Sequence, residues 1–278
     1  MSKSSRPVSP RDDALGAEAS ELGGADAAPL LRVLGIMNSD GSISADSRRK
    51  FKQVSHLIPL LVSNMVDLPK GRPVDIVDLN CGNAYLGLIL GWWLVRQGVA
   101  CRLLGVDRDP ARIDACRRKA KTLGFHDAEF EVGDALTYPL PDSPFAVLSL
   151  HGCDTATDDA LVRAVATNAE HLLAVPCCHR EVRTLLAPSR DHAPFIGDGI
   201  LEADHAAILT DALRMQWLRA QGYRTGVIEF VPWEHTPRNR LVRARRGLDA
   251  TARSRARLIY SEACAGLKSP PSVLQSLE

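Results

Sequence analysis

The sequence predicts an α/β protein with a doubly wound, mostly parallel seven-stranded sheet that ends in an antiparallel C-terminal hairpin. Short apolar runs alternate with helical patterns from residue 74 onward, as expected when strands are buried on both faces. A turn of small residues at 80–83 follows the first apolar run. Two late apolar runs, 225–231 and 241–244, are separated by a short loop and therefore predict the hairpin.

Composition predicts one large domain with short extensions. The 278 residues are 45% apolar and 24% charged, and a net charge of +1 excludes a protein that is basic throughout. The seven cysteines lack the spacing of a small disulfide scaffold and follow no signal-like apolar segment, so we expect a reduced, cytoplasmic protein. We expect a disordered leader at 1–29, a helical extension at 30–72, the α/β domain at 73–247 and a basic helix with a tail at 248–278.

The helical extension contains an amphipathic pattern. Between residues 45 and 66 apolar residues recur at intervals of three and four, which predicts a helix that Ser44 or Asp46 could cap. Lys52, near the start of this helix, is a candidate substrate contact, although a charged residue on a helix usually belongs to a solvated face.

The turn at 80–83 is the first candidate ligand site. Residues 74–79 form a buried strand, and Asn80, Gly82 and Asn83 are residue types that tolerate positive φ or cap a helix. The backbone could therefore turn sharply and present N–H groups to a ligand at the carboxyl end of a strand. An ordinary βα loop would have the same pattern.

Acidic residues follow the next two predicted strands. The helix at 85–95 leads to a strand at 101–106 that ends in Asp107, and the helix at 110–123 leads to a strand at 128–132 that precedes Asp134. In nucleoside-binding α/β folds an acid at the end of the second strand accepts hydrogen bonds from ribose hydroxyls, and Asp134 could contact an adenine edge. The alternative for both acids is a helix cap.

Two polar turns follow the remaining parallel strands. A strand at 144–150 leads into the turn at 151–158 and a helix at 159–165, and a strand at 172–175 leads into the turn at 176–179. We interpret 180–203, with its prolines and glycines, as an irregular loop that could cover a substrate, before a helix at 206–220.

These polar turns contain the candidate catalytic groups. His151, Asp154 and His179 could remove a proton from a substrate, and each could instead make a structural hydrogen bond. A nucleophilic Cys177 or Cys178 is an alternative.

The same turns raise the question of a metal. Zinc could be bound by His151, Cys153, Cys177, Cys178 and His179. Because adjacent cysteines lack the usual two-residue spacing, we expect no metal.

The motifs resemble those of a known family. Asp78-Leu-Asn-Cys-Gly82, Gly105-Val-Asp107 and Gly133-Asp134 resemble the nucleoside-binding motifs of class I S-adenosylmethionine-dependent methyltransferases. The turns at 151–158 (HGCDTATD) and 176–179 (PCCH) more specifically resemble a methyltransferase-like subfamily that includes acceptor-stem tRNA 2′-O-methyltransferases.

The resemblance covers about residues 45–246 and implies a methyltransferase with S-adenosylmethionine as cofactor. The first glycine of the family's acidic-x-Gly-x-Gly turn is replaced here by Asn80, the best non-glycine residue if positive φ is required. The cofactor-binding residues that it implies are Asp78, Asn80, Gly82, Asn83, Asp107 and Asp134.

The C-terminal region suggests the substrate class. Eight arginines against the single acid Asp249 lie between residues 236 and 257, enough for a phosphate-binding face, although a solvated helix and hairpin would have the same composition. We expect RNA as the partner, and the resemblance to the subfamily described above implies tRNA as one candidate. A non-catalytic nucleoside-binding module and a small-molecule or protein methyltransferase are alternatives, whereas the late hairpin disfavours a nicotinamide oxidoreductase. The substrate-binding candidates are Lys52, Cys177, Cys178, His235, Arg238 and Asn239.

Overall fold

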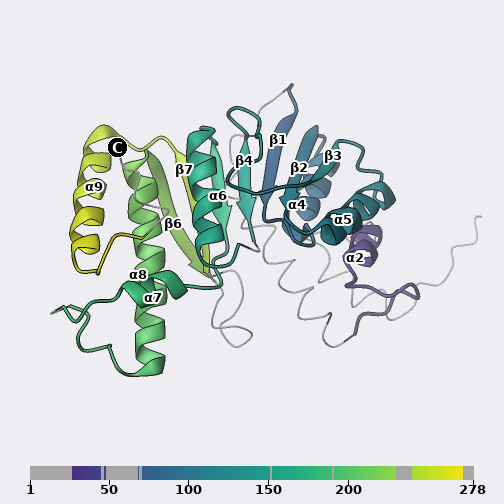
Figure 1. Ribbon diagram of the computed structural model, residues 1–278. Coiled ribbons are helices and arrows are strands. Elements are labelled where there is room, and N and C mark those ends of the chain that lie inside the picture. Colours follow the sequence, from purple (N-terminus) through teal and green to yellow (C-terminus); the bar gives the residue numbers. More distant parts are fainter. Residues whose placement is uncertain are drawn as a thin grey trace, which may run out of the picture.

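The computed structural model describes residues 27–44, 47, 68, 71–150, 152–189, 191–229 and 240–271 (Figure 1). Several sequence-based expectations fall elsewhere. The leader up to residue 26 and nearly all of the helix expected at 45–66 lie outside the described residues, as do Lys52, His151, His235, Arg238 and Asn239.

A seven-stranded sheet organises the molecule, with the strand order β3-β2-β1-β4-β5-β7-β6. Strands β1 to β5 pair in parallel, whereas β7 is antiparallel to both β5 and β6. The predicted fold class is therefore confirmed. The strands are β1 (Val74–Leu79), β2 (Cys101–Asp107), β3 (Ala128–Val132), β4 (Ala146–Ser149), β5 (His171–Ala174), β6 (Tyr223–Glu229) and β7 (Arg240–Arg246).

The strand order changes direction between β1 and β4. The chain builds β2 and β3 on one side of β1, and then β4 and β5 on the other. In open α/β sheets ligands bind outside the carboxyl ends of the strands at such a switch point. This edge of the sheet is where the site must be sought.

Helices cover both faces of the sheet (Figure 1). One core contains Ile76 of β1 with apolar residues of α2, α4 and α5, and the other contains the adjacent Val77 with residues of α6, α8 and α9. Alternate side chains of a strand thus enter different cores. The helices are α2 (Ala28–Val33), α4 (Tyr85–Arg96), α5 (Pro110–Thr122), α6 (Thr155–Ala166), α7 (Arg180–Leu185), α8 (Gly199–Ala220) and α9 (Ala250–Ala265).

The interpretation of 180–203 as an irregular loop was wrong. Helix α7 occupies its start, and α8 begins at Gly199, where the Asp198 side chain accepts hydrogen bonds from the N–H groups of Ile200 and Leu201. Apolar periodicity missed these turns because Ile200 and Leu201 are 75% and 52% exposed and do not extend the buried stripe.

Two other helices begin earlier than the sequence suggested. Helix α6 begins at Thr155 and not at 159. The apolar pattern did not indicate its first turn because the residues buried there, Thr157 and Asp158, are polar. Helix α2 begins at Ala28, inside the segment assigned to the leader. Among the helices that the structure describes, none combines the length and apolar character needed to cross a bilayer.

Candidate functional site

The turn after β1 has the backbone that its sequence requires. Asn80 and Gly82 both have φ of 54°, so Asn80 adopts the left-handed conformation expected of a glycine substitute. The Asn80 amide Nδ2 also donates a hydrogen bond to the carbonyl of Ala156 at 3.1 Å. The asparagine therefore ties the turn to the first turn of α6, which glycine could not do.

Asp107 joins the loops that follow β1 and β2. Its Oδ2 accepts a hydrogen bond from the Gly82 N–H at 2.8 Å, and its Oδ1 accepts one from the Asp109 N–H at 3.0 Å. The cap of α5 is Asp109 and not Asp107. A carboxylate can accept about four hydrogen bonds, so Asp107 retains capacity for a ligand.

Asp78 lies beneath the turn and is only 1% exposed. Its Oδ2 accepts a hydrogen bond from the Gly87 N–H at 3.2 Å, and burial raises the pKa of this carboxyl well above its ordinary value. A Cβ atom at Gly87 would lie 2.8 Å from Asp78 Oδ2, so glycine is required there. Asp78 thus supports the turn from within.

Asp134 follows β3 at the same edge of the sheet. It accepts a hydrogen bond from the Leu136 N–H at 2.8 Å and forms an ion pair with Arg108. The Leu136 hydrogen bond and then Arg108 hold the pKa of Asp134 below its usual range. Asn83 is exposed in the turn, and its carbonyl accepts a hydrogen bond from Lys119 Nζ.

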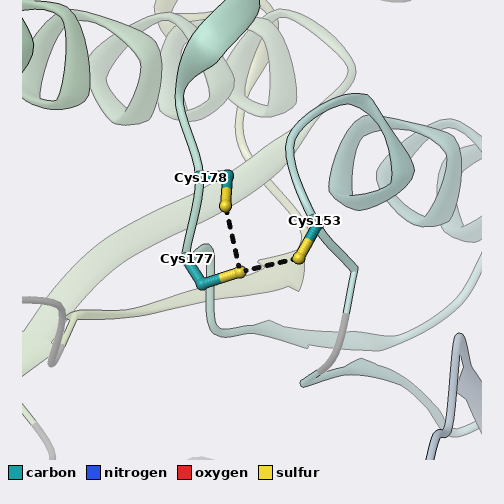
Figure 2. Close-up of side chains that lie close together, drawn as sticks. All are labelled: Cys153, Cys177 and Cys178. Atoms are coloured by element: carbon teal, nitrogen blue, oxygen red, sulfur yellow. Dashed lines mark hydrogen bonds between the residues drawn. The ribbon is translucent and has the colours of Figure 1, made fainter.

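Three cysteines meet between the loops that follow β4 and β5 (Figure 2). The Sγ atom of Cys177 lies 3.2 Å from that of Cys153 and 3.7 Å from that of Cys178. None of the three takes part in a disulfide. Burial, followed by the hydrogen bond with Cys153, raises the pKa of Cys177 to about 12, which disfavours a nucleophilic thiolate.

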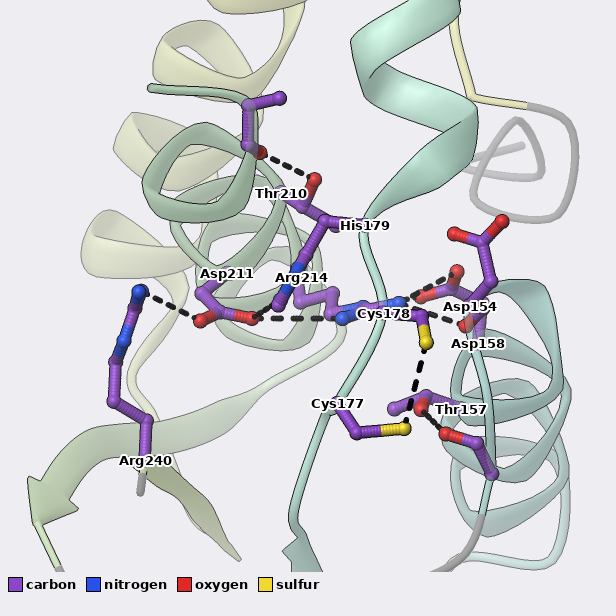
Figure 3. A network of polar contacts seen from close by, with 12 residues as sticks. Asp154, Thr157, Asp158, Cys177, Cys178, His179, Thr210, Asp211, Arg214 and Arg240 are labelled. Carbon is purple, nitrogen blue, oxygen red and sulfur yellow. Dashed lines mark hydrogen bonds and ion pairs between the residues drawn. The ribbon is translucent and has the colours of Figure 1, made fainter. Parts of the chain in front are cut away.

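A buried arginine organises the loop that carries Asp154 (Figure 3). Arg214 of α8 is 0% exposed and contacts Asp158 with two nitrogens, at 2.6 Å and 3.1 Å. Its Nη2 also donates to the Asp154 carbonyl at 2.9 Å. Asp154 has φ of 54° and ψ of −119°, a strained backbone for a residue other than glycine, and Arg214 helps to hold it there.

Asp211, one turn before Arg214, connects this network to the candidate base His179 (Figure 3). One carboxylate oxygen lies 3.1 Å from His179 Nε2, and the other lies 2.8 Å from Arg240 Nη1. Because two arginines flank it, Asp211 is best described as a carboxylate that accepts the Nε2–H. The imidazole then retains Nδ1 as its basic nitrogen.

A cavity of about 620 Å³ opens beside these groups. Asp154 and His179 line one side, Asp211 and Arg240 come from α8 and β7, and Arg180 begins α7. The structure therefore brings together the predicted residues Asp154 and His179, next to the cysteines. The size of the cavity and its lining of both polar and apolar residues suit a polar substrate.

Sequence reasoning missed Asp158, Asp211 and Arg214. A signal for two of them was present, because Asp211 and Arg214 fall within the apolar stripe formed by Ala206, Leu213 and Trp217 of α8. A charge within such a stripe has to find a buried partner.

The prediction of one arginine-rich face was wrong for β7. Arg245 lies opposite Arg224 on one face of the sheet, whereas Arg240 and Arg246 alternate with Arg245 and point to the other face. The register also places Arg245 beside His171, at the amino end of β5. Of the arginines on β7, Arg240 is the one that lines the cavity.

A comparison with known families identifies the domain. Residues 49–185 match a family described as "Methyltransferase domain". This part of the chain, just under half of its length, is therefore similar to a methyltransferase domain. No curated protein sequence matches the chain.

The chain is also similar to several solved structures, of which three are described. The magnesium protoporphyrin IX methyltransferase of Synechocystis PCC 6803 with bound SAM is 16% identical, with 87% of this chain and 100% of that chain covered and a TM-score of 0.43. An rRNA methylase from Streptococcus thermophilus is 11% identical, with 68% and 96% covered and a TM-score of 0.44.

The third structure is the Pyrococcus abyssi tRNA (uracil-54, C5)-methyltransferase, which is 18% identical, with 69% of this chain and 38% of that chain covered and a TM-score of 0.39. All three TM-scores are low, so the fold assignment rests on the strand order itself.

Proposed function

We propose that the protein is an S-adenosylmethionine-dependent methyltransferase that acts on RNA, with tRNA as the first candidate. The observation that carries the proposal is the gathering of Asn80, Gly82, Asp107 and Asp134 at the carboxyl ends of β1, β2 and β3. These residues lie within the matched methyltransferase domain.

The residues of this edge suit the polar parts of the cofactor. The free lone pairs of Asp107 would accept hydrogen bonds from the ribose hydroxyls, and Asp134 would accept one from an adenine amino group. Asp134 would share its carboxylate with Arg108, its present ion-pair partner. S-adenosylmethionine supplies the methyl group on a sulfonium.

The cavity would hold the methyl acceptor next to the cofactor. The Asn80 amide contacts Ala156, two residues after Asp154 of the cavity wall, so the turn and the cavity share one loop. Methyl transfer is an in-line displacement, and the protein contributes mainly by positioning the acceptor. For an acceptor that loses a proton, Nδ1 of His179 would take it, while Asp211 orients the ring.

The preference for RNA rests on charge at the cavity. Arg180 is exposed, and no hydrogen bond or ion pair of its side chain is recorded within the part of the chain that the structure describes, so it is available for a phosphate. Arg240 already pairs with Asp211 and would position the acceptor more closely. The positive charge that favours RNA is thus confined to the cavity, and it does not continue along β7 as one basic face.

Calorimetry with S-adenosylmethionine, S-adenosylhomocysteine and NAD tests the cofactor. We expect the first two to bind and NAD not to bind; failure of the first two would overturn the proposal. If the cofactor binds, the protein is incubated with labelled S-adenosylmethionine and total RNA or cell extract. Label in RNA is expected, label only in protein or small molecules would overturn the RNA assignment, and binding without transfer would indicate a non-catalytic module.

Two matched pairs of variants test the residue roles. His179→Gln should abolish transfer while cofactor affinity is retained, whereas His126→Gln, at the amino end of β3, should leave transfer unchanged. Arg180→Ala should raise the KM for RNA, whereas Arg245→Ala, at the far edge of the sheet, should not. Equal effects within a pair would contradict the assignment.

A further inference from the structure

The cysteine cluster is built by two loops that are adjacent in the sheet. Ser149 of β4 pairs with Ala174 of β5, and Cys153 and Cys177 follow these strands at nearly equal distances along the chain. The pairing of the strands therefore brings the loops together. The spacing of Cys177 and Cys178 could not indicate this cluster, because its third thiol, that of Cys153, comes from a different loop.

The positions of the sulfur atoms are close to those of a tetrahedral thiolate site. A zinc ion with Zn–S bonds of about 2.3 Å requires its sulfurs to lie about 3.8 Å apart. The Sγ atoms of Cys177 and Cys178 are 3.7 Å apart, those of Cys153 and Cys177 are 3.2 Å apart, and all three lie within 4.8 Å of one another. Shifts of a few tenths of an ångström would admit the ion.

The loop that carries Cys153 is anchored by hydrogen bonds on both sides of the thiol. The carbonyl of Gly152 accepts a hydrogen bond from the Thr157 hydroxyl at 2.6 Å, and the carbonyl of Asp154 accepts one from Arg214 at 2.9 Å. Asp154 Oδ1 also accepts a hydrogen bond from the Glu181 N–H at 3.3 Å, which links this loop to the first turn of α7. Such outer contacts hold ligands in position before a metal arrives.

The cysteine cluster borders the cavity. Cys153 and Cys178 both line it, and within the described part of the chain the group of close ligand atoms contains three residues. His179 is not in this group, and its Nε2 contacts Asp211 instead. Structural zinc sites have four protein ligands, whereas three protein ligands with an open position are typical of catalytic sites.

We propose that Cys153, Cys177 and Cys178 bind one thiophilic divalent cation, zinc in the first instance, whose open coordination position faces the substrate cavity. Binding replaces the three thiol protons with the metal, so protons are released as three metal–sulfur bonds form. The open position would take a water molecule or a sulfur, nitrogen or oxygen atom of the substrate. The proposal does not depend on the identity of the methyl acceptor.

The test begins with metal content. The full chain is purified with a reductant and without chelators, and zinc is measured by inductively coupled plasma mass spectrometry. We expect about one zinc per chain. Apoprotein made with a chelator and reloaded with Co²⁺ should show the intense visible bands of four-coordinate cobalt and a thiolate charge-transfer band in the near ultraviolet.

Variants locate the site. Cys153→Ser, Cys177→Ser and Cys178→Ser should each weaken zinc affinity by at least about tenfold, as judged by competition with a chromophoric chelator. Cys264→Ser is the matched control, because Cys264 is a buried free thiol on α9. Circular dichroism confirms that each variant is folded, and loss of zinc in the control alone, or equally in all four, would overturn the proposal.

Two further outcomes separate the alternatives. Reduced, folded protein that takes up neither zinc nor cobalt overturns the proposal, and a Cys153–Cys177 disulfide found by mass spectrometry after that protein is kept in air without reductant would identify a redox pair instead. Adding a small thiol to the cobalt protein should shift its visible bands. An unchanged spectrum with cobalt still bound would contradict the open position.

Discussion

Replacing Arg214 with methionine should destabilise the fold strongly. Arg214 is 0% exposed and neutralises Asp158, which is itself only 3% exposed, through contacts at 2.6 Å and 3.1 Å. Removing one partner of a buried ion pair leaves the other charge uncompensated, at a cost of about 3–5 kcal/mol. That range already includes the cost of losing the hydrogen bond from Arg214 to the Asp154 carbonyl. The free energy of unfolding is measured by urea denaturation followed by circular dichroism.

Two further variants decide whether the buried charge is the cause. Arg183→Met removes an arginine whose ion pair with Glu202, at 2.9 Å, is partly exposed, and should cost no more than about 1 kcal/mol. Arg214→Met combined with Asp158→Leu removes both charges and should recover most of the stability. The reasoning fails if the single Arg214 variant loses less than about 1 kcal/mol, or if the double variant is no more stable than the single one.

Three other predictions concern the turn after β1 and α8. Asp107→Ala should weaken S-adenosylmethionine binding by about 1–3 kcal/mol in calorimetry, and unchanged affinity would remove its assignment. Asn80→Val should cost about 1–2 kcal/mol in urea denaturation because φ is 54°, whereas Asn80→Gly should cost less; equal losses would contradict a conformational cause. Burial, and then His192, lowers the pKa of His205 from its ordinary value of 6.5. The unfolded chain therefore takes up this proton first, and stability should fall as pH drops from about 6.5 through the lower folded-state pKa. His205→Asn should flatten that decline, and an unchanged pH profile of the denaturation midpoint would exclude His205 as its source.

The strands could be predicted from sequence because their signal is local. Each parallel strand is a short apolar run that fills both cores, as Ile76 and Val77 do, and the positive φ of Asn80 follows from residue type and position in the turn. The boundaries failed where buried polar residues or exposed apolar ones interrupt the pattern. Thr157 in α6 and Ile200 in α8 are examples.

The polar network could not be predicted because its contacts join residues that are distant in the chain. Arg214 and Asp158 are 56 positions apart, and Cys153 and Cys177 are 24 positions apart. Only the strand order brings their loops and helices together. The sequence identified the reactive residue types, but not which of them are neighbours.

The position of β7 has a consequence for the cavity. β7 covers the outer side of β5, and with α8 it supplies one wall of the cavity. Both elements lie beyond residue 185, where the match to the methyltransferase family ends. A chain cut there would leave β5 as an unprotected edge strand, prone to aggregate. The part that completes the sheet thus also shapes the proposed acceptor cavity, so we expect mutations in it to alter the choice of substrate and to leave the proposed cofactor site, built entirely from residues before 135, as it is.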